Sequence, residues 1–307
     1  MVRHYFWGKM IEIAAPDFDL EKTLNSGQVF HWEKIGNGYC GTIGDIAVEV
    51  ERCGSVLKVR CAETATRSPR RPLPGIVGHY FALDHPLAKI RATFPNDEVM
   101  NAARDFCRGV RIIRQPKWEC LATFICSSMK QVAHIRQISH ALRRRFGAAR
   151  AIDNYVLRTF PTAKRLAESS EKELRECALG YRAKNLLATA RLVANGNADL
   201  EKWAVLSDDD LREKLCELPG VGAKVANCVM LFAYERLRAF PIDVWIERVL
   251  KEKYFPRRRK IRTGELRDFS AKYFGDHGGY AQQYLFHHAR MTAARGARAM
   301  CSKVSKT

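Results

Sequence analysis

The sequence predicts an α+β protein in which an N-terminal antiparallel β lobe precedes a mostly α-helical body. Two patterns lead to this class. In the first third of the chain, short runs of alternating apolar and polar residues end at glycine-containing turns, which is typical of antiparallel strands. From about residue 86 onward, apolar residues recur with the period of an amphipathic helix.

Three strands are expected in the first third, over residues 38–43, 46–50 and 56–59. The segment 67–75 contains three prolines and three arginines and is expected to form a loop. We therefore predict a β lobe over residues 1–103, a helical domain over residues 104–294 and a basic tail over residues 295–307.

Two helices have the clearest apolar stripes. The first stripe consists of Val132, Ile135, Ile138, Leu142 and Phe146, and the second of Val225, Cys228, Val229 and Phe232. Ser207 precedes three aspartates and is expected to cap a further helix that continues through Leu211.

The composition favours a globular protein that meets a polyanion. The 307 residues include 52 Lys and Arg against 33 Asp and Glu, which gives a formal net charge of +19. Such a charge attracts nucleic acid before most other partners. Hydrophobic residues make up 47% of the chain, which argues against a disordered protein. No apolar run approaches the ~20 residues of a membrane span, so no membrane partner is expected.

The ten cysteines form no Cys-x-x-Cys pair and no tight cluster, so we expect buried free thiols in a reducing compartment. The protein is therefore expected inside the cell. The basic cluster at residues 257–260 fits either a phosphate-facing loop or a nuclear signal.

The most informative stretch is the turn Leu218-Pro219-Gly220-Val221-Gly222 between two helical segments. The two glycines permit positive φ and close backbone approach. The free N–H groups at the start of the second helix can bind a phosphate. The pattern indicates a helix-hairpin-helix element that holds the DNA backbone through Gly220, Val221 and Gly222. The alternative is an ordinary tight turn between helices.

Lys224 lies in the first turn of the second, otherwise apolar helix. The helix dipole disfavours a cation at this position. A half-buried amine that stays uncharged is suited to act as a Schiff-base nucleophile. The competing interpretation is a lysine that extends to solvent or binds a phosphate.

Asp243 follows the hairpin after a short turn, at the position of a helix N-cap, so capping is its simplest role. The chain returns here toward the start of the hairpin helix. An acid that caps its own helix and also faces Lys224 would stabilise the positive charge that develops as a glycosidic bond breaks.

Together these residues resemble the helix-hairpin-helix DNA glycosylases, and specifically the 8-oxoguanine DNA glycosylase branch. Further segments that are similar to this branch, in its order, are residues 24–32, 80–84, 109–115, 124–128, 179–184 and 279–286. The similarity covers nearly the whole chain. It implies an antiparallel β lobe and a two-lobed helical body with the active site in the cleft between its lobes.

The resemblance also implies roles for the site residues. Lys224 matches the nucleophile that attacks the sugar C1′ and forms a Schiff base, and Asp243 matches the essential acid. Gly27 matches the glycine whose carbonyl senses the extra N7 hydrogen of 8-oxoguanine.

The same resemblance assigns a base pocket. Phe286 and Cys228 match the residues that sandwich the flipped base, and Gln282 matches the one that reads its Watson–Crick edge. The spacing agrees, because Cys228 lies four residues after Lys224 and Phe286 four residues after Gln282. Ordinary core packing is the alternative for Phe286 and Cys228.

Tyr181 and Arg182 match residues that wedge into the duplex and contact the orphaned base, and we expect both to be exposed. The backbone carbonyls of Cys216, Leu218 and Val221 match those that hold a structural monovalent cation in the hairpin.

Three positions depart from the eukaryotic pattern and resemble bacterial members. Met129 replaces an asparagine and His134 an arginine, and both of the replaced residues contact the orphaned cytosine. Because Met129 makes no useful hydrogen bond and His134 lacks the arginine fork, we predict a relaxed preference for the opposite base. Trp245 replaces a histidine that contacts a phosphate near the flipped base.

The resemblance implies a bifunctional base-excision-repair glycosylase and lyase, acting as a monomer on double-stranded DNA that contains oxidised guanine. Ring-opened purines are a further substrate class. No cofactor is required, and no iron–sulfur cluster is expected, because only Cys301 lies near the end of the chain. The alternatives are another helix-hairpin-helix base glycosylase, such as one for alkylated purines, and a non-catalytic DNA-binding module.

Overall fold

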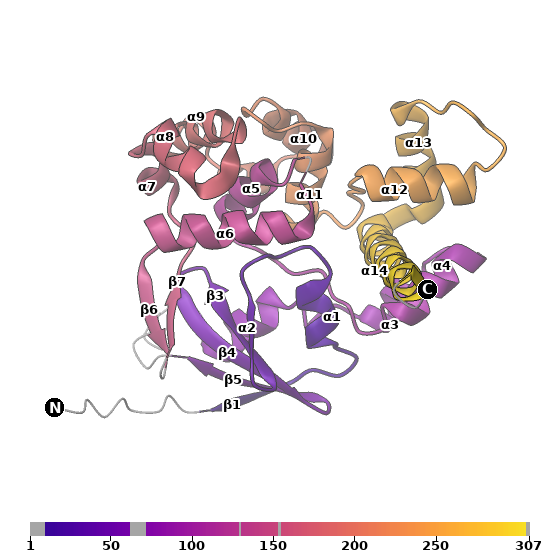
Figure 1. Ribbon diagram of the computed structural model, residues 1–307, viewed down its shortest axis with the longest axis horizontal. Helices are drawn as coiled ribbons and strands as arrows, with labels where there is room; N and C mark the ends of the chain where they lie inside the picture. The colour runs from indigo at the N-terminus through magenta and orange to yellow at the C-terminus, as the bar shows by residue number, and fades with distance from the viewer. Residues whose placement is uncertain (1–9, 62–71, 129, 153–154, 305–307) are drawn as a thin grey trace.

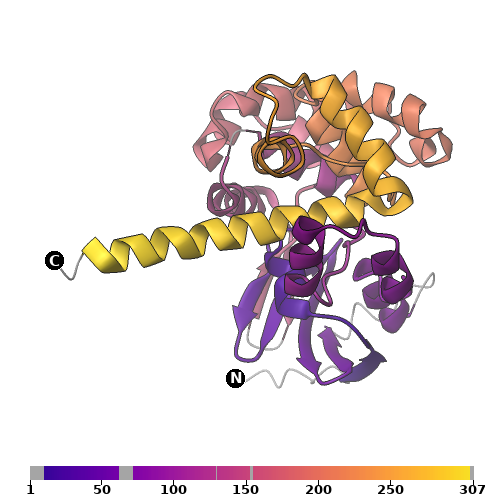
Figure 2. The same ribbon diagram turned by 90° about the vertical axis from the view of Figure 1, so that its right-hand side faces the viewer.

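The structure is a computed structural model that describes residues 10–61, 72–128, 130–152 and 155–304, with side chains described up to residue 294. A sheet lobe lies below a helical body, and the body divides into a group around α5 to α11 and a second group around α12 to α14 (Figure 1). The long helix α14 passes between the upper helices and the sheet lobe and then projects from the body (Figure 2). The predicted α+β class is confirmed.

The sheet lobe contains a five-stranded antiparallel sheet in the order β1-β5-β4-β3-β2. Its strands are β1 Ile11–Ala14, β2 Glu33–Ile35, β3 Gly38–Ile43, β4 Ile46–Cys53 and β5 Val56–Cys61. Gly44 and Gly54 have φ of 61° and 63° in the turns between the last three strands, a conformation that glycine adopts without steric cost. The three predicted strands are therefore confirmed, whereas β1 and β2 escaped prediction.

Trp32 is the centre of this lobe's core. Its ring packs directly on β3, because a Cβ at Gly41 would lie 2.5 Å from the ring. Its Nε1 donates a hydrogen bond of 3.0 Å to the hydroxyl of Tyr80. Tyr80 ends helix α2, Leu73–Tyr80, whose first turn contains Pro74. The loop predicted over 67–75 is therefore wrong for residues 73–75, because proline is well tolerated in the first turn of a helix; residues 62–71 lie outside the described part of the chain.

Helices make up most of the remaining structure. The α-helices are α1 Leu20–Asn25, α3 Leu87–Ala92, α4 Glu98–Phe106, α5 Lys117–Cys126, α6 Val132–Phe146, α7 Ala163–Ala167, α8 Glu171–Leu174, α9 Arg182–Ala194, α10 Asp208–Cys216, α11 Ala223–Ala233, α12 Val244–Val249, α13 Thr263–Phe274 and α14 Gly278–Val304. Short 3₁₀ or π segments are η2 Arg175–Leu179, η3 Lys202–Val205, η4 Leu250–Tyr254 and η5 Gly275–His277.

The two predicted apolar stripes are confirmed in α6 and α11. In α6, Ile135, Ile138 and Leu142 are buried in the large core of the helical body. The predicted cap of α10 is also present, because the Ser207 hydroxyl accepts a hydrogen bond of 3.2 Å from the backbone N–H of Asp210.

Three features differ from the predicted division of the chain into a β lobe, a helical domain and a tail. Helix α3 precedes residue 104 and helix α4 crosses it, yet their buried side chains Leu87, Ile90 and Met100 belong to the core of the helical body. Strands β6 Ala149–Ile152 and β7 Tyr155–Arg158 form a hairpin beside β3 and β4 that the sequence reading missed. Helix α14 continues across residue 294, so the backbone of residues 295–304 is helical.

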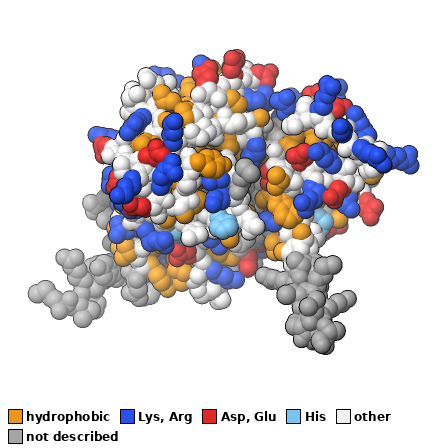
Figure 3. Space-filling view, turned by 45° about the horizontal axis from the view of Figure 1, so that its top comes forward, with side chains coloured by type: hydrophobic (Ala, Val, Ile, Leu, Met, Phe, Trp, Pro, Cys, Tyr) orange, Lys and Arg blue, Asp and Glu red, His pale blue; other side chains and the backbone are white. Residues whose placement is uncertain are grey.

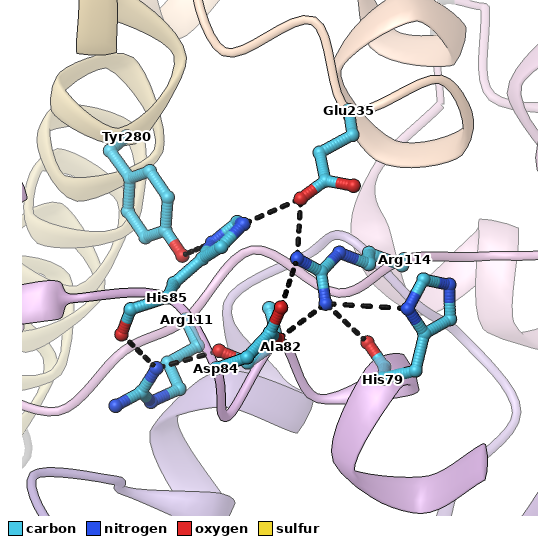
Figure 4. Close-up of polar contacts among 8 residues, drawn as sticks. All are labelled: His79, Ala82, Asp84, His85, Arg111, Arg114, Glu235 and Tyr280. Carbon is cyan, nitrogen blue, oxygen red and sulfur yellow. Dashed lines mark hydrogen bonds and ion pairs between the residues drawn. The ribbon is translucent and has the colours of Figure 1, made fainter. Parts of the chain in front are cut away.

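A polar cluster, called here the Glu235 clasp, joins distant segments at the junction of the lobes (Figure 4). It consists of Asp84, His85, Arg114, Glu235 and Tyr280. His85 Nε2 lies 2.6 Å from Glu235 Oε1, and His85 Nδ1 lies 2.7 Å from the Tyr280 hydroxyl. The Arg114 guanidinium donates to Glu235 at 2.5 Å and to both carboxylate oxygens of Asp84 at 2.5 and 3.0 Å. The clasp ties the α2–α3 connection to the end of α11 and to α14.

Candidate active site

One cavity brings together residues that lie far apart in the sequence. It is lined by Gly27, Phe124, Lys224, Cys228, Phe232, Pro241, Asp243, Gln282, Gln283 and Phe286. These residues come from the loop after α1, from α5 and α11, from the approach to α12 and from α14. The cavity therefore lies between the two groups of helices, and it unites the predicted nucleophile, acid and base-pocket glycine, cysteine, glutamine and phenylalanine.

Lys224 is the second residue of α11, whose N-cap, Gly222, offers no side-chain cap to the first-turn N–H groups. Its Nζ donates a hydrogen bond of 3.1 Å to the Ser127 hydroxyl and lies 5.1 Å from the centre of the Phe124 ring. Within the described residues, no carboxylate oxygen lies within the 4.0 Å of an ion pair with this amine. A neutral hydroxyl and a ring therefore hold the amine, rather than a fixed salt bridge.

Asp243 both caps a helix and borders the cavity. It is the N-cap of α12, because Oδ1 accepts hydrogen bonds from the backbone N–H groups of Trp245 at 3.0 Å and Ile246 at 2.9 Å. It also lines the cavity with Lys224. Burial raises the pKa of Asp243 above its ordinary value, while the capping N–H groups and the charge of Lys224 oppose this shift.

The opposite part of the cavity has an aromatic wall and an amide. Phe286 packs against Gly27, whose φ is 89°, so closely that a Cβ at Gly27 would lie 2.9 Å from the Phe286 ring. Gln282 is 4% exposed, and its Oε1 has no hydrogen-bond partner among the described residues. Burial raises the pKa of the Cys228 thiol to about 11, which keeps it a neutral, apolar contact surface.

Sequence reasoning assigned no role to several cavity residues. Phe124 and Phe232 stack with ring centres 5.5 Å apart and an interplanar angle of 11°. Phe232 lies two turns after Lys224 on the same face of α11, so its spacing was a usable signal. Ser127, which holds the lysine, and Gln283, which lines the cavity from α14, had no comparable local signal.

The predicted helix-hairpin-helix is confirmed as α10, a tight turn and α11. Gly220 has a φ of 82°, and a Cβ there would lie 2.8 Å from the Cβ of Asn185 on α9. The Thr189 hydroxyl of α9 also donates to the Pro219 carbonyl at 2.9 Å. These contacts fix the turn against α9, and the uncapped first turn of α11 presents backbone N–H groups beside it.

The expected wedge requires a correction. Tyr181 is 57% exposed at the start of α9, as predicted, but Arg182 is only 5% exposed. The Arg182 guanidinium donates to the carbonyls of Ser128 and Leu179 and lies 4.3 Å from the centre of the Tyr181 ring. The prediction of an exposed Arg182 is therefore wrong, because two carbonyls satisfy the side chain inside the protein.

Three further predicted contacts have different environments. His134 is exposed near the start of α6. Met129 lies outside the described residues. Trp245, which was expected near the flipped base, is not among the residues that line the cavity; it is half-buried, and the guanidinium of Arg248 lies 5.5 Å from the centre of its ring.

The remaining surface is rich in cations. Lys and Arg side chains occur on both halves of the face in Figure 3. The cluster at residues 257–260 lies in the connection between η4 and α13, where Lys251, Arg258 and Arg262 help to line a surface hollow. None of the helices in the described part of the chain has the length and apolar composition of a membrane span. Nine cysteines in that part are free, and most are buried, as expected.

No group of three or more His, Cys, Asp or Glu side chains within the described residues is arranged to hold a metal ion. In the hairpin, the Leu218 carbonyl accepts a hydrogen bond of 3.1 Å from Val221, and Cys216 is the last residue of α10. Backbone carbonyls at such a helix end are the donor type that a monovalent cation uses.

Comparison with known proteins identifies the family. Residues 10–121 match the model of the N-terminal domain of 8-oxoguanine DNA glycosylase, and residues 122–271 match the HhH-GPD superfamily of base-excision DNA repair proteins. An N-glycosylase/DNA lyase of Saccharomyces cerevisiae is 34% identical over 86% of this chain and 75% of that protein. A probable N-glycosylase/DNA lyase of Methanothermobacter thermautotrophicus is 29% identical over 91% of this chain and 96% of that protein.

A solved structure gives the same result. The 8-oxoguanine glycosylase/lyase of Clostridium acetobutylicum, in complex with double-stranded DNA containing cytosine opposite 8-oxoG, has a TM-score of 0.83 and 29% identity, over 94% of this chain and 99% of that one. The two domain matches, the hairpin and the cavity agree, and the chain therefore belongs to the 8-oxoguanine DNA glycosylase family of the HhH-GPD base-excision-repair superfamily.

Proposed function

We propose that this chain releases 8-oxoguanine from double-stranded DNA and then cleaves the strand at the resulting abasic site, with Lys224 as the nucleophile. The observation that carries the proposal is the placement of an amine without a fixed ion pair in one cavity with a partly buried carboxylate and an unsatisfied amide. The chemistry requires this combination: a nucleophile, a stabiliser of positive charge and a group that reads a base.

The lone pair of Lys224 Nζ attacks C1′ of the damaged nucleotide. The electron pair of the C1′–N9 bond leaves with the base, which takes up a proton. Asp243 stabilises the positive charge that develops on the sugar. Opening of the sugar ring gives a Schiff base between C1′ and Nζ. Loss of a proton from C2′ then breaks the bond between C3′ and its oxygen. This elimination cleaves the strand on the 3′ side of the site.

The base pocket supplies selection. Phe286 and Cys228 form the surfaces between which the flipped purine stacks, and the Gln282 amide pairs with its Watson–Crick edge. The Gly27 carbonyl accepts the N7–H that distinguishes 8-oxoguanine from guanine. Ring-opened purines present a similar edge and form a second substrate class.

The DNA contacts lie around the cavity. The backbone of Gly220, Val221 and Gly222 at the start of α11 binds phosphates, and the exposed Tyr181 enters the duplex. The guanidinium of Arg182 packs against the Tyr181 ring and holds it in place. A monovalent cation on the carbonyls of Cys216, Leu218 and Val221 would stiffen the hairpin. The protein acts as a monomer, in the nucleoid-associated cytoplasm of a bacterium or in a eukaryotic nucleus.

The test is borohydride trapping on a duplex with one 8-oxoguanine. We expect a covalent adduct with the native protein, none with Lys224→Gln, and a loss of excision on the order of 10³-fold or more in that variant. Lys89→Gln, which changes an exposed lysine of α3, is the matched control and should trap normally.

Two outcomes would contradict the proposal. Base release by the native protein without an adduct would indicate a monofunctional glycosylase. DNA binding without release or adduct would favour a binding module or a different lesion, such as an alkylated purine.

We also expect a relaxed preference for the base opposite the lesion. In the eukaryotic pattern an arginine and an asparagine contact the cytosine, and His134 and Met129 stand at these positions here. Single-turnover excision should differ by less than about 10-fold among duplexes with C, A, G or T opposite 8-oxoguanine. A strict requirement for cytosine would refute this expectation.

A further inference from the structure

Helix α14 holds the loop that presents Gly27 to the cavity. Arg290 Nη2 donates a hydrogen bond to the Asn25 carbonyl, and Gln283 Nε2 donates one of 2.9 Å to the Ser26 carbonyl. On the other side of Gly27, Gln115 Nε2 donates to the Gln28 carbonyl at 2.7 Å. Three of the four successive carbonyls are therefore held by side-chain donors.

The Gly27 carbonyl is the exception. Within the described residues, no hydrogen bond to it is found, although its neighbours on both sides are bonded. A backbone carbonyl in a half-buried loop normally finds a donor. The loop is thus arranged so that one carbonyl stays available beside the cavity while the flanking ones are immobilised.

Arg290 is packed closely into this arrangement. Its guanidinium lies 5.4 Å from the centre of the Phe286 ring, and a Cβ at Gly27 would lie 3.2 Å from its Nη1. No ion pair joins it to a carboxylate within the described part of the chain. Partial burial of an arginine without such a partner destabilises the folded state, because the guanidinium loses water; hydrogen bonds to carbonyls offset this loss.

We propose that Arg290 and Gln283 are positioning residues for lesion recognition: from α14 they fix the 25–28 loop so that the Gly27 carbonyl stands at the distance and angle needed to accept the N7–H of 8-oxoguanine. This inference rests on the proposed function. It accounts for two polar side chains of α14 that the chemistry itself does not use. It also makes Arg290 set both the loop and the Phe286 wall, so that the two sides of the pocket keep a constant spacing.

The experiment separates base recognition from strand cleavage. Arg290→Met, Gln283→Met and Arg290→Lys are compared with the native protein in two single-turnover assays: release of 8-oxoguanine, and cleavage of a duplex with a preformed abasic site. Because abasic DNA has no base to recognise, the ratio of release to cleavage should fall by about 10-fold or more in both Met variants, the effect of a misplaced group in a preorganised site. Arg290→Lys, which keeps a donor and the charge, should recover part of the ratio.

Arg108→Met, which removes an exposed cation after α4, is the control for loss of charge and should keep the native ratio. A parallel fall of both rates in Arg290→Met would overturn the inference and indicate a direct DNA contact. An unchanged ratio in Gln283→Met and Arg290→Met would also overturn it. If Arg290→Met does not fold, Gln283→Met decides. A native protein that cleaves abasic DNA but releases no 8-oxoguanine would refute the proposed substrate instead, a result distinct from a defect confined to the variants.

Discussion

The cavity and the Glu235 clasp are both polar clusters at junctions between lobes, but they differ in whether their acceptor oxygens have hydrogen-bond donors. In the clasp, Glu235 accepts from His85 and Arg114, and Arg114 also holds Asp84. The hydrogen bond from His85, together with Arg114, lowers the pKa of Glu235 to about 2. In the cavity, Asp243 has its pKa raised by burial, and the Gln282 oxygen lacks a partner in the described structure.

The difference indicates what each cluster is for. A cluster whose carboxylate oxygens meet cationic donors stabilises the folded arrangement of the segments that it joins, and in the clasp Arg114 Nε is the described atom left without a partner. A cluster with a desolvated carboxylate and an orphaned amide has a cost in the free protein, which a ligand can recover on binding. The unsatisfied acceptor oxygen of Gln282 therefore distinguishes the cavity from the clasp, where Glu235 and Asp84 both accept hydrogen bonds.

The largest expected effect is that of Asp243→Asn, which tests whether the desolvated carboxylate serves the chemistry. Asparagine is an equally good N-cap, so α12 should remain intact. Excision should fall on the order of 100-fold or more, as for the loss of one preorganised electrostatic group. Because burial raises the pKa of Asp243, the folded state disfavours the ionised form, and the variant should be at least as stable as the native protein at pH 7.

The measurement combines single-turnover excision with urea unfolding at pH 7. If Asp243→Asn were clearly less stable and still active, the carboxylate would be structural, as in the clasp, and the contrast between the two clusters would disappear.

Gln282→Met should have an intermediate effect. The unmade hydrogen bond to the base is worth about 1–3 kcal/mol, which corresponds to roughly 5- to 150-fold in excision. Stability should be unchanged or slightly higher, because the variant removes a buried oxygen that has no partner in the free protein. Loss of more than about 1 kcal/mol in the free energy of unfolding would show that the amide is already satisfied without ligand.

Glu235→Gln should have the smallest effect on activity and act on stability alone. The lowered pKa of Glu235 means that its stabilisation is present above the unfolded value and is lost as the pH falls toward about 2. The side chain is 37% exposed, so screening limits the cost of the variant at pH 7 to about 1–2 kcal/mol.

This loss should shrink as the pH falls from 5 toward 2, as followed by thermal unfolding, and excision at 25 °C should stay near the native rate. Glu213→Gln, which changes an exposed glutamate of α10, is the control. A stability difference that does not depend on pH would contradict the ionic role of the clasp.

Much of the site follows from local patterns. The hairpin glycines, the start of α11 and the cap at Asp243 each depend on a few neighbouring residues, and a helix places Lys224, Cys228 and Phe232 on one face wherever it packs. The resemblance then indicated which distant segments meet. The hairpin of β6 and β7 was missed because its exposed, arginine-containing strands lack a clear alternation of apolar residues.

The sequence by itself determined the α+β class and the helix-hairpin-helix, since period, capping and turn chemistry are local properties. Only the tertiary structure decided which polar side chains are satisfied and by what. In the sequence, Arg182 and Arg290 are both arginines of the kind usually found at the surface. In the structure, Arg182 packs against Tyr181, whereas Arg290 donates a hydrogen bond to the loop that contains Gly27. Their partners are backbone carbonyls from distant segments, and every residue carries such a carbonyl, so no residue pattern marks the contact in advance.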